Sequence, residues 1–243
     1  DVRIRQVSRT GALMGSEIVA NEGSADAFAA RLACGVNFCA AVWASDPHQS
    51  STQIVLRAWD ATTLASYAFL GLADAGVYAT APDICFNPTD ARFLVVWQQG
   101  IAGGYWDIWA SHVTSGGQPL ETKAVSTAVH HQSTPRVAYC GTAARYLVVW
   151  EDYRSGTGWD IYGQRLERGG ALGGSAVAVF QGAAADLSPG VAGHGGAKAE
   201  FLVAFARDIS GASQFQIYAC RVPGTGGAGG AFAVRLENNV RDD

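Results

Sequence analysis

Short apolar runs recur along the chain at a regular spacing. "YLVVW" (residues 146–150) has close copies in "FLVVW" (93–97) and "FLVAF" (201–205), and a weaker copy in "FCAAVW" (38–43). The aromatic residues that close these runs lie 54, 53 and 55 residues apart; they are Trp43, Trp97, Trp150 and Phe205. A period of about 40–55 residues is typical of a propeller, a solenoid or another repeat array.

Two further landmarks accompany each run. The segment "DIYGQRL" begins at Asp160 and has counterparts at Gln53, Asp107 and Gln216, and a proline precedes the runs at Pro82, Pro135 and Pro189. These segments are short, rich in β-branched and aromatic residues, and bounded by Gly, Ser, Asp or Pro, which is the pattern of β-strands. No convincing stretch carries the apolar stripe of an amphipathic helix.

Each repeat therefore predicts four strands, which we name A to D. In the third repeat they are "PRVAY", "YLVVW", "DIYGQRL" and "SAVAVF". A four-stranded antiparallel unit repeated radially is a propeller blade. We predict an all-β propeller of four to five blades with about 54 residues per repeat, in a single domain with blades at residues 28–80, 81–130, 131–184 and 185–243.

The chain opens with a partial blade at residues 1–27. "DVRIRQV" (residues 1–7) aligns with the C strand, which leaves residues 1–21 with C and D strands but no A or B strand before them. An open strand edge is normally covered in a soluble protein. We therefore expect residues 2–7 to pair either with residues 231–236, which would close the ring, or with another protein chain.

The combined pattern "P-x-VA…YLVVW…DIYGQRL…G-x-L" resembles the tandem β-propeller repeats of bacterial secreted and surface proteins. The resemblance covers essentially the whole chain and is best over residues 80–222. It implies a propeller fold and a secreted, extracellular or periplasmic setting. It implies no specific activity, because propellers host unrelated functions.

The amino-acid composition limits the kinds of partner that the protein is expected to bind. Charged residues are only 16% of the chain, 30 of the 243 residues are glycine, and the net charge is −4 with scattered cations. The sequence has no basic footprint for nucleic acid and no apolar run long enough to span a membrane. Phosphate-binding and dinucleotide-binding fingerprints and hydrolase triads are also missing, so no cofactor is expected.

The five cysteines indicate one candidate disulfide. Cys34 and Cys39 flank the turn "CGVNFC" and could pair, whereas Cys85, Cys140 and Cys220 lie in strand-like runs. Plain core thiols are the alternative, because buried cysteine behaves as a small hydrophobe. No CxxC or Cys/His spacing indicates a metal site.

Polar and aromatic side chains gather in the loops between B and C strands. Glu151, Asp152, Arg154 and Trp159 could hold a sugar by hydrogen bonds and stacking, or could form a turn in which Asp caps amides and Arg pairs locally. The repeat does not maintain this acidic pair, since Gln98 and Gln99 replace it in the preceding repeat.

Neighbouring loops add further candidate ligand-binding residues. These are Tyr105, Trp106, His130 and His131. Trp106 and Trp159 occupy matching positions, where an exposed ring would stack on a sugar and a buried ring would pack between blades. The two adjacent histidines point to opposite sides of an extended segment, which disfavours metal binding. Asp107 and Asp160 begin C strands and fit a structural, turn-closing role.

Repetition without one distinctive polar cluster favours a non-catalytic, secreted recognition or scaffold module. The expected partners are other protein chains of a surface assembly, with surface glycans second. The alternatives are a glycan-binding lectin and a propeller glycoside hydrolase. A hydrolase needs carboxylates about 5–10 Å apart near the central channel; the candidates are Asp46, Glu151, Asp152, Asp186 and Asp208.

Overall fold

The computed structural model describes residues 1–21, 25–46, 51–73, 76–101, 103–209, 214–225 and 233–236. All regular secondary structure in these ranges is β-strand, and no helix there could cross a membrane. The strands are β1 (Arg3–Val7), β2 (Leu13–Val19), β3 (Asp26–Cys34), β4 (Phe38–Asp46), β5 (Gln53–Asp60), β6 (Ser66–Gly71), β7 (Tyr78–Asn87), β8 (Arg92–Gly100), β9 (Trp106–Thr114), β10 (Pro119–Ser126), β11 (Gln132–Cys140), β12 (Arg145–Asp152), β13 (Asp160–Glu167), β14 (Val177–Phe180), β15 (Asp186–Gly193), β16 (Glu200–Asp208), β17 (Phe215–Pro223) and β18 (Ala233–Leu236).

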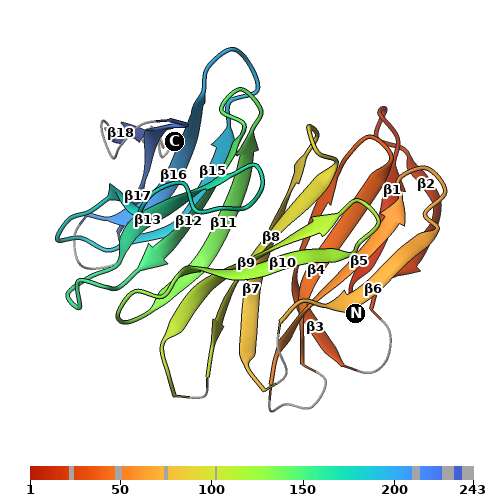
Figure 1. The fold of residues 1–243 in the computed structure, drawn as a ribbon, viewed down its shortest axis with the longest axis horizontal. Helices are drawn as coiled ribbons and strands as arrows, with labels where there is room; N and C mark the ends of the chain where they lie inside the picture. Colours follow the sequence, from red (N-terminus) through yellow and green to blue (C-terminus); the bar gives the residue numbers. More distant parts are fainter. Residues whose placement is uncertain are drawn as a thin grey trace, which may run out of the picture.

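The strands form four complete antiparallel sheets and one two-stranded hairpin (Figure 1). We name them blade 1 (β3–β6), blade 2 (β7–β10), blade 3 (β11–β14), blade 4 (β15–β18) and the partial blade (β1–β2). The strands follow in chain order within each sheet, and the first strands β3, β7, β11 and β15 pack successively against one another. The predicted all-β propeller of four to five blades is confirmed.

The B strands β4, β8, β12 and β16 supply the packing between blades. In β8, Phe93, Val95 and Trp97 join the core shared with blade 1, whereas Leu94 and Val96 join the core shared with blade 3. A strand that is buried on both faces reads as a continuous apolar run. The repeat aromatics Trp43, Trp97, Trp150 and Phe205 are all buried in these layers.

Each inner strand is bent at the same place by a β-bulge. The residue at the bulge has a positive φ of 57°, 51°, 54° and 53° at Ala29, Ala81, Thr134 and Ser188, respectively. Left-handed backbone is uncommon for residues other than glycine, and a following proline normally disfavours helical conformations. The bulge redirects the side chains that follow it.

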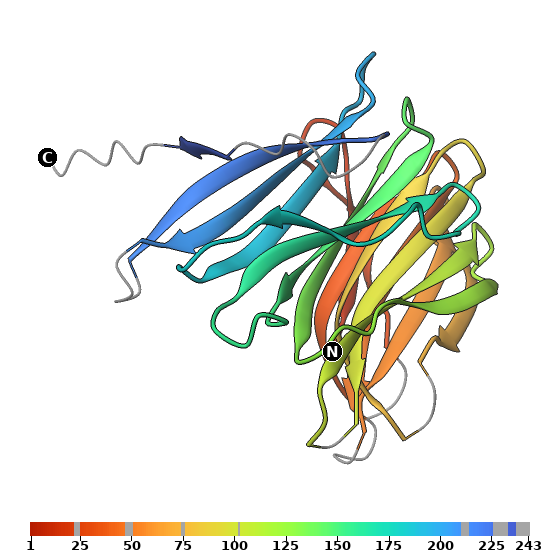
Figure 2. The same cartoon turned by 60° about the vertical axis from the view of Figure 1, so that its left-hand side comes forward.

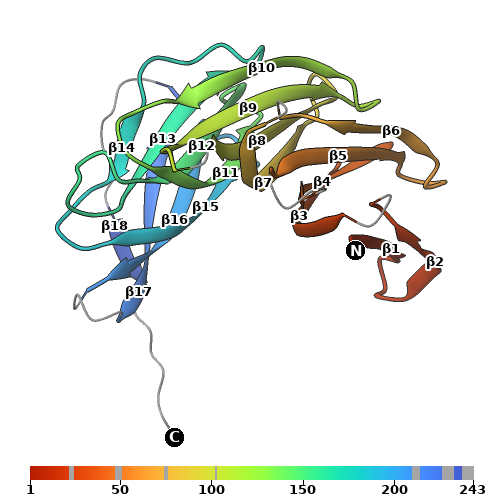
Figure 3. The ribbon, with the colours of Figure 1, turned by 90° about the horizontal axis from the view of Figure 1, so that it is seen from below.

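The ring is open between its first and last strands. Figure 3 shows an arc with the hairpin β1–β2 at one end, and Figure 2 shows blade 4 at the other. The predicted closure by residues 231–236 is wrong for the described part of that segment, because β18 pairs with β17 as the outer strand of blade 4; residues 231 and 232 lie outside the described residues. Among the described residues, β1 pairs with β2 alone.

The turn between β3 and β4 carries a disulfide. The Sγ atoms of Cys34 and Cys39 lie 2.05 Å apart, and the Cα atoms lie 4.0 Å apart. The thiols of Cys85, Cys140 and Cys220 are free. Burial raises the pKa of Cys220 to about 11, so this thiol stays protonated and unreactive at neutral pH.

Candidate functional site

Charged side chains on the inner strands of three blades influence one another electrostatically. Arg31, Asp83 and Arg136 each follow the bulge of an inner strand by two residues, in blades 1, 2 and 3. The electrostatic environment of Arg136 includes both Asp83 and Arg31. Blades 1 and 3 are not neighbours, so this interaction places the arginines across the centre where the inner strands converge.

Asp83 is the acid of this axial cluster. Its Oδ2 accepts a hydrogen bond from the backbone N–H of Val137 at 2.9 Å. Burial raises the pKa of the Asp83 carboxyl, and the backbone amides and the two arginines only partly offset this effect. A carboxyl with a raised pKa beside a cation is a candidate for proton transfer.

Glu151 is the second carboxylate that acts on Arg136. Its Oε2 accepts hydrogen bonds from Ser133 Oγ at 3.1 Å and Thr134 Oγ1 at 3.0 Å, and its Oε1 accepts one from Ser188 N at 2.7 Å. Gln98 has the same place in blade 2, where its Oε1 accepts from Thr134 N at 2.8 Å. Both side chains therefore brace the left-handed residue of the following blade.

The predicted acidic pair does not converge. Asp152 lies on the opposite face of β12 from Glu151, because successive strand residues alternate. The indole of Trp150 donates to Asp152 Oδ2 at 2.7 Å, and Arg154 donates to the same carboxylate through Nε at 2.8 Å and Nη2 at 2.6 Å. This pair closes a turn and holds the indole in place.

Of the predicted turn acids, Asp107 is the second residue of β9 and Asp160 is the first residue of β13. Asp160 Oδ1 accepts from the backbone N–H of Gly182 at 3.1 Å, and burial raises the pKa of both carboxyls. Asp46 and Asp208 end B strands on the same edge as Asp152. These positions line one rim of the propeller and do not form a single cluster.

Asp186 is a fully buried acid at the start of β15. The Arg207 Nη1 atom lies 3.6 Å from its Oδ1, and neither carboxylate oxygen has a hydrogen-bond partner among the described residues. Burial raises the pKa of Asp186 to about 6, and the Arg207 charge offsets only part of that effect. Asp186 and Arg207 thus form a buried ion pair between β15 and β16.

An aromatic hollow of about 440 Å³ opens on the loop face between blades 2 and 3. Its walls include Tyr78, Ile101, Trp106 and His131. The Tyr105 ring, more than half exposed, lies 5.1 Å from that of His131 and 5.2 Å from that of His130.

Trp159 lies outside this hollow. It is half-buried, and its ring centroid lies 5.1 Å from that of Tyr153. Of the predicted aromatic and histidine residues, the structure thus brings Tyr105, Trp106, His130 and His131 together. Across the described ranges, no three His, Cys, Asp or Glu side chains gather as a metal site requires.

Comparisons with solved structures show this fold in carbohydrate-active enzymes. A thermostable family-43 glycoside hydrolase is 10% identical, with a TM-score of 0.57 over 89% of this chain and 74% of that one. The catalytic domain of a Coprinopsis cinerea GH62 α-L-arabinofuranosidase is 12% identical, with a TM-score of 0.51 over 85% and 67%. A GH43 β-1,3-galactosidase is 7% identical, with a TM-score of 0.50 over 91% and 79%.

No family model matches the sequence, and a search of curated proteins finds no match. At these identities the comparisons establish the fold class, a β-propeller of the kind found in these hydrolases. These comparisons contradict the non-catalytic function that the repeats in the sequence had favoured. A non-catalytic recognition or scaffold module was the leading hypothesis, and the structures that share the fold are instead described as glycoside hydrolases.

Arg31, Asp83 and Arg136 were not among the candidates drawn from the sequence. Asp83 and Arg136 directly follow Pro82 and Pro135, in "PDIC" and "PRVAYC". The only feature of the sequence that could have indicated these residues is the change of charge at one position of the repeat, directly after the proline. The direction in which these side chains point depends on the bulge, and the apolar pattern of the sequence does not indicate a bulge.

Proposed function

We propose that the chain is a propeller glycoside hydrolase whose reacting carboxylates are Asp83 and Glu151. The observation that carries the proposal is that these two acids, from different blades, both lie within electrostatic range of the Arg136 guanidinium. Glycoside hydrolysis needs two carboxyl groups with different protonation states. A carboxyl whose pKa is raised by its surroundings is the candidate for the acid.

The surroundings of the two carboxyls assign their roles. Burial favours the neutral form of Asp83, so this residue is the general acid that protonates the leaving oxygen. Glu151 accepts hydrogen bonds from two hydroxyls and one backbone amide, which fix the position of its carboxylate. Glu151 takes the other role, that of base or nucleophile, and Arg136 stabilises the negative charge that develops on Asp83 as its proton leaves.

The aromatic hollow supplies a platform for sugar rings. It shares strand β7 with the acid, since Tyr78 lines the hollow and Asp83 lies five residues further along. At about 3.3 Å per residue the two are at most about 17 Å apart along the strand, a span that suits an oligosaccharide chain. Arabinofuranosides and galactosides are the first substrates to test, since two of the solved structures with this fold are described as an α-L-arabinofuranosidase and a β-1,3-galactosidase.

Hydrolysis of 4-nitrophenyl and 2,4-dinitrophenyl arabinofuranosides and galactosides by the full chain tests the proposal. Asp83→Asn is expected to lose about 10²–10⁴-fold in kcat/KM with the poorer leaving group. It should lose far less with the dinitrophenyl group, which departs without a proton. Glu151→Gln should lose activity with both, because it acts on the sugar carbon.

Glu121→Gln is the matched control. Glu121 lies on the outer strand β10, where it pairs with Lys123 at the surface, and its variant should keep full activity. Glu151→Gln should fold, since Gln98 makes the equivalent bond in blade 2. An absence of turnover on the whole panel, or equal losses for Asp83→Asn with both leaving groups, would contradict these roles.

We also propose an exported setting with surface or extracellular glycans as the substrate. The Cys34–Cys39 disulfide supports it, because disulfides persist in oxidising compartments. The repeat pattern supports it through its resemblance to secreted bacterial propellers. Detection of the Cys34–Cys39 pair in material from the native source would test it, and a fully reduced pair would oppose it.

A further inference from the structure

The β-bulge in β11 brings two hydroxyl groups to the carboxylate of Glu151. Ser133 lies opposite Glu151 in the pairing of β11 with β12, and Arg136 lies opposite Val149. Three residue steps of β11 therefore match two residue steps of β12, as a bulge requires. Residues three apart in a regular strand point to opposite faces, but here Ser133 and Arg136 share the face of Glu151. Thr134, at the bulge itself, reaches the same carboxylate.

The hydrogen bonds engage the two oxygens of this carboxylate differently. Ser133 Oγ donates to Oε2 at 3.1 Å, and Thr134 Oγ1 donates to the same oxygen at 3.0 Å. Oε1 accepts from the backbone N–H of Ser188 at 2.7 Å. Each carboxylate oxygen has two lone pairs. The hydroxyls therefore use both lone pairs of Oε2, whereas one lone pair of Oε1 is left without a donor among the described residues.

The carboxylate and the two hydroxyls occur together in blade 3 and in none of the other three complete blades. The residue that follows the repeat aromatic in blades 1 to 4 is Ala44, Gln98, Glu151 and Ala206. The two residues at the bulge are, in the same order, Phe28–Ala29, Thr80–Ala81, Ser133–Thr134 and Leu187–Ser188. All four inner strands bend at this place, so the bulge itself does not require two hydroxyls. The hydroxyl pair accompanies the carboxylate.

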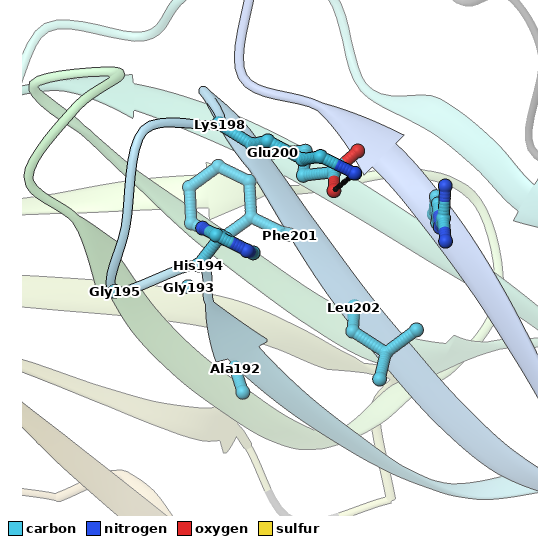
Figure 4. A pocket seen from close by; sticks show the side chains of 9 residues that line it. Ala192, Gly193, His194, Gly195, Lys198, Glu200, Phe201 and Leu202 are labelled. Carbon is cyan, nitrogen blue, oxygen red and sulfur yellow. Dashed lines mark ion pairs between the residues drawn. The ribbon is translucent and has the colours of Figure 1, made fainter.

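The carboxylate of Glu200 in blade 4 has a different setting. Glu200 lines a hollow of about 440 Å³ at the turn between β15 and β16, beside His194 and Lys198 (Figure 4). Lys198 Nζ lies 3.8 Å from its Oε1, on a side chain that is 60% exposed. None of the described residues that line this hollow carries a hydroxyl group. An exposed ion pair of this length does not fix the orientation of a carboxylate.

We propose that Ser133 and Thr134 are positioning residues for the reaction, and that they hold Glu151 with Oε1 as its reacting oxygen. This proposal rests on the glycoside hydrolase function proposed above. The remaining lone pair of Oε1 either takes a proton from a water whose oxygen bonds to the anomeric carbon, or itself bonds to that carbon. In both cases the bond from this carbon to the leaving oxygen breaks, its electron pair stays on the leaving oxygen, and Asp83 gives its proton to that oxygen.

The anchoring is effective because a free glutamate side chain samples many rotamers. Restricting it costs conformational entropy, and the two hydroxyls and the Ser188 amide impose this restriction before a substrate binds. A reacting group that is displaced by about 1 Å can cost about 10²-fold in rate. Removal of a hydroxyl should therefore slow the chemical step more than it weakens substrate binding.

Thr134→Val removes one hydroxyl with little change of shape. It should lower kcat about 10–100-fold and change KM less than about threefold. The loss should be the same for the 4-nitrophenyl and 2,4-dinitrophenyl glycosides, because Glu151 acts on the sugar carbon in both. Thr134→Ser, which keeps the hydroxyl, should retain kcat within about threefold of the unaltered chain. If Thr134→Val does not fold, Ser133→Ala gives the same test with the same expected result.

Two control variants separate positioning from a general effect of substitution. Thr80→Val removes the hydroxyl at the position of Ser133 in blade 2, where the opposite residue is Gln98. Glu200→Gln neutralises the carboxylate beside the hollow of blade 4. Both variants should keep kcat within about twofold of the unaltered chain.

Amide hydrogen exchange at Ser188, measured by NMR, reports on Glu151 without a substrate, because the Ser188 N–H donates to Oε1. Thr134→Val should speed this exchange at least about tenfold, and Thr80→Val should leave it unchanged. The proposal is overturned if the double variant Ser133→Ala, Thr134→Val keeps both its kcat and slow exchange at Ser188. A lack of turnover by the unaltered chain contradicts the glycoside hydrolase function instead, and exchange at Ser188 then decides whether the hydroxyls position Glu151.

Discussion

The indole of Trp150 offers a way to measure what the buried Asp152 carboxylate contributes to the core. Its Nε1 donates to Asp152 at 2.7 Å, and the Trp97 indole in blade 2 donates to the neutral amide oxygen of Gln99 at 3.0 Å. Both rings are fully buried. A phenylalanine at either site removes the same ring atoms and one hydrogen bond, so only the charge of the acceptor differs.

Loss of a hydrogen bond to a charged group costs about 1.5–3 kcal/mol, and to a neutral group about 0.5–1.5 kcal/mol. Trp150→Phe should therefore lower the free energy of unfolding by about 1 kcal/mol more than Trp97→Phe. Trp150→Ala should cost about 3–5 kcal/mol, because it also opens a cavity. Urea unfolding followed by far-UV circular dichroism gives these values without relying on tryptophan fluorescence.

Equal losses for the two phenylalanine variants would refute the reasoning on charge. A cost below about 1 kcal/mol for Trp150→Ala would refute the packing itself, because large-to-small changes at a buried aromatic residue are among the most damaging. Tyr105→Ala, at a ring more than half exposed, is the control and should change stability by less than about 0.5 kcal/mol.

Three other variants test separate features. Burial raises the pKa of Asp186 to about 6 in the folded chain, so the native state binds the Asp186 proton more tightly than the unfolded state does. The free energy of unfolding should therefore fall as pH rises from about 4 to 6. Asp186→Asn should reduce this fall, which thermal melts at several pH values would measure. Under denaturing, non-reducing conditions three of the five thiols should react, and replacing Cys34 and Cys39 by serine should cost about 2 kcal/mol by the loop-closure estimate. A Cβ on Gly193 would come 2.2 Å from a carbonyl oxygen of the neighbouring inner strand, so Gly193→Ala should cost about 1–3 kcal/mol in urea unfolding, whereas Gly190→Ala meets no atom within 4 Å and should be nearly neutral.

The repeat made the fold predictable from the sequence. "YLVVW" and "DIYGQRL" correspond to β12 (Arg145–Asp152) and β13 (Asp160–Glu167), and "DVRIRQV" and the segment after it form the hairpin of the partial blade. Strands that are buried on both faces carry long apolar runs, and such runs can be recognised in one sequence. The order of strands in a blade follows from short connections between them.

The axial cluster could not be predicted in the same way. Alternation along a strand assigns faces only while the period of two holds, and a bulge places two residues opposite one. The bulge before Asp83 and Arg136 therefore reverses the expected faces of the side chains that follow. Glu151 and Asp152 do not converge for a different reason: they are adjacent on β12, and adjacent strand residues point to opposite faces of the sheet.

The bulge has a consequence for how the centre of the ring evolves. The four blades are copies of one unit, so they form an alignment within a single molecule. All four copies keep a left-handed residue at the bulge, yet the position two residues later has diverged to Arg31, Asp83, Arg136 and Gly190. Identical groups around a pseudo-symmetric ring would accept a ligand in several equivalent orientations. Because the residues at this position differ, the equivalent orientations are no longer equal in energy. Duplication thus preserves the scaffold, and the centre of the ring acquires one preferred orientation for a bound ligand.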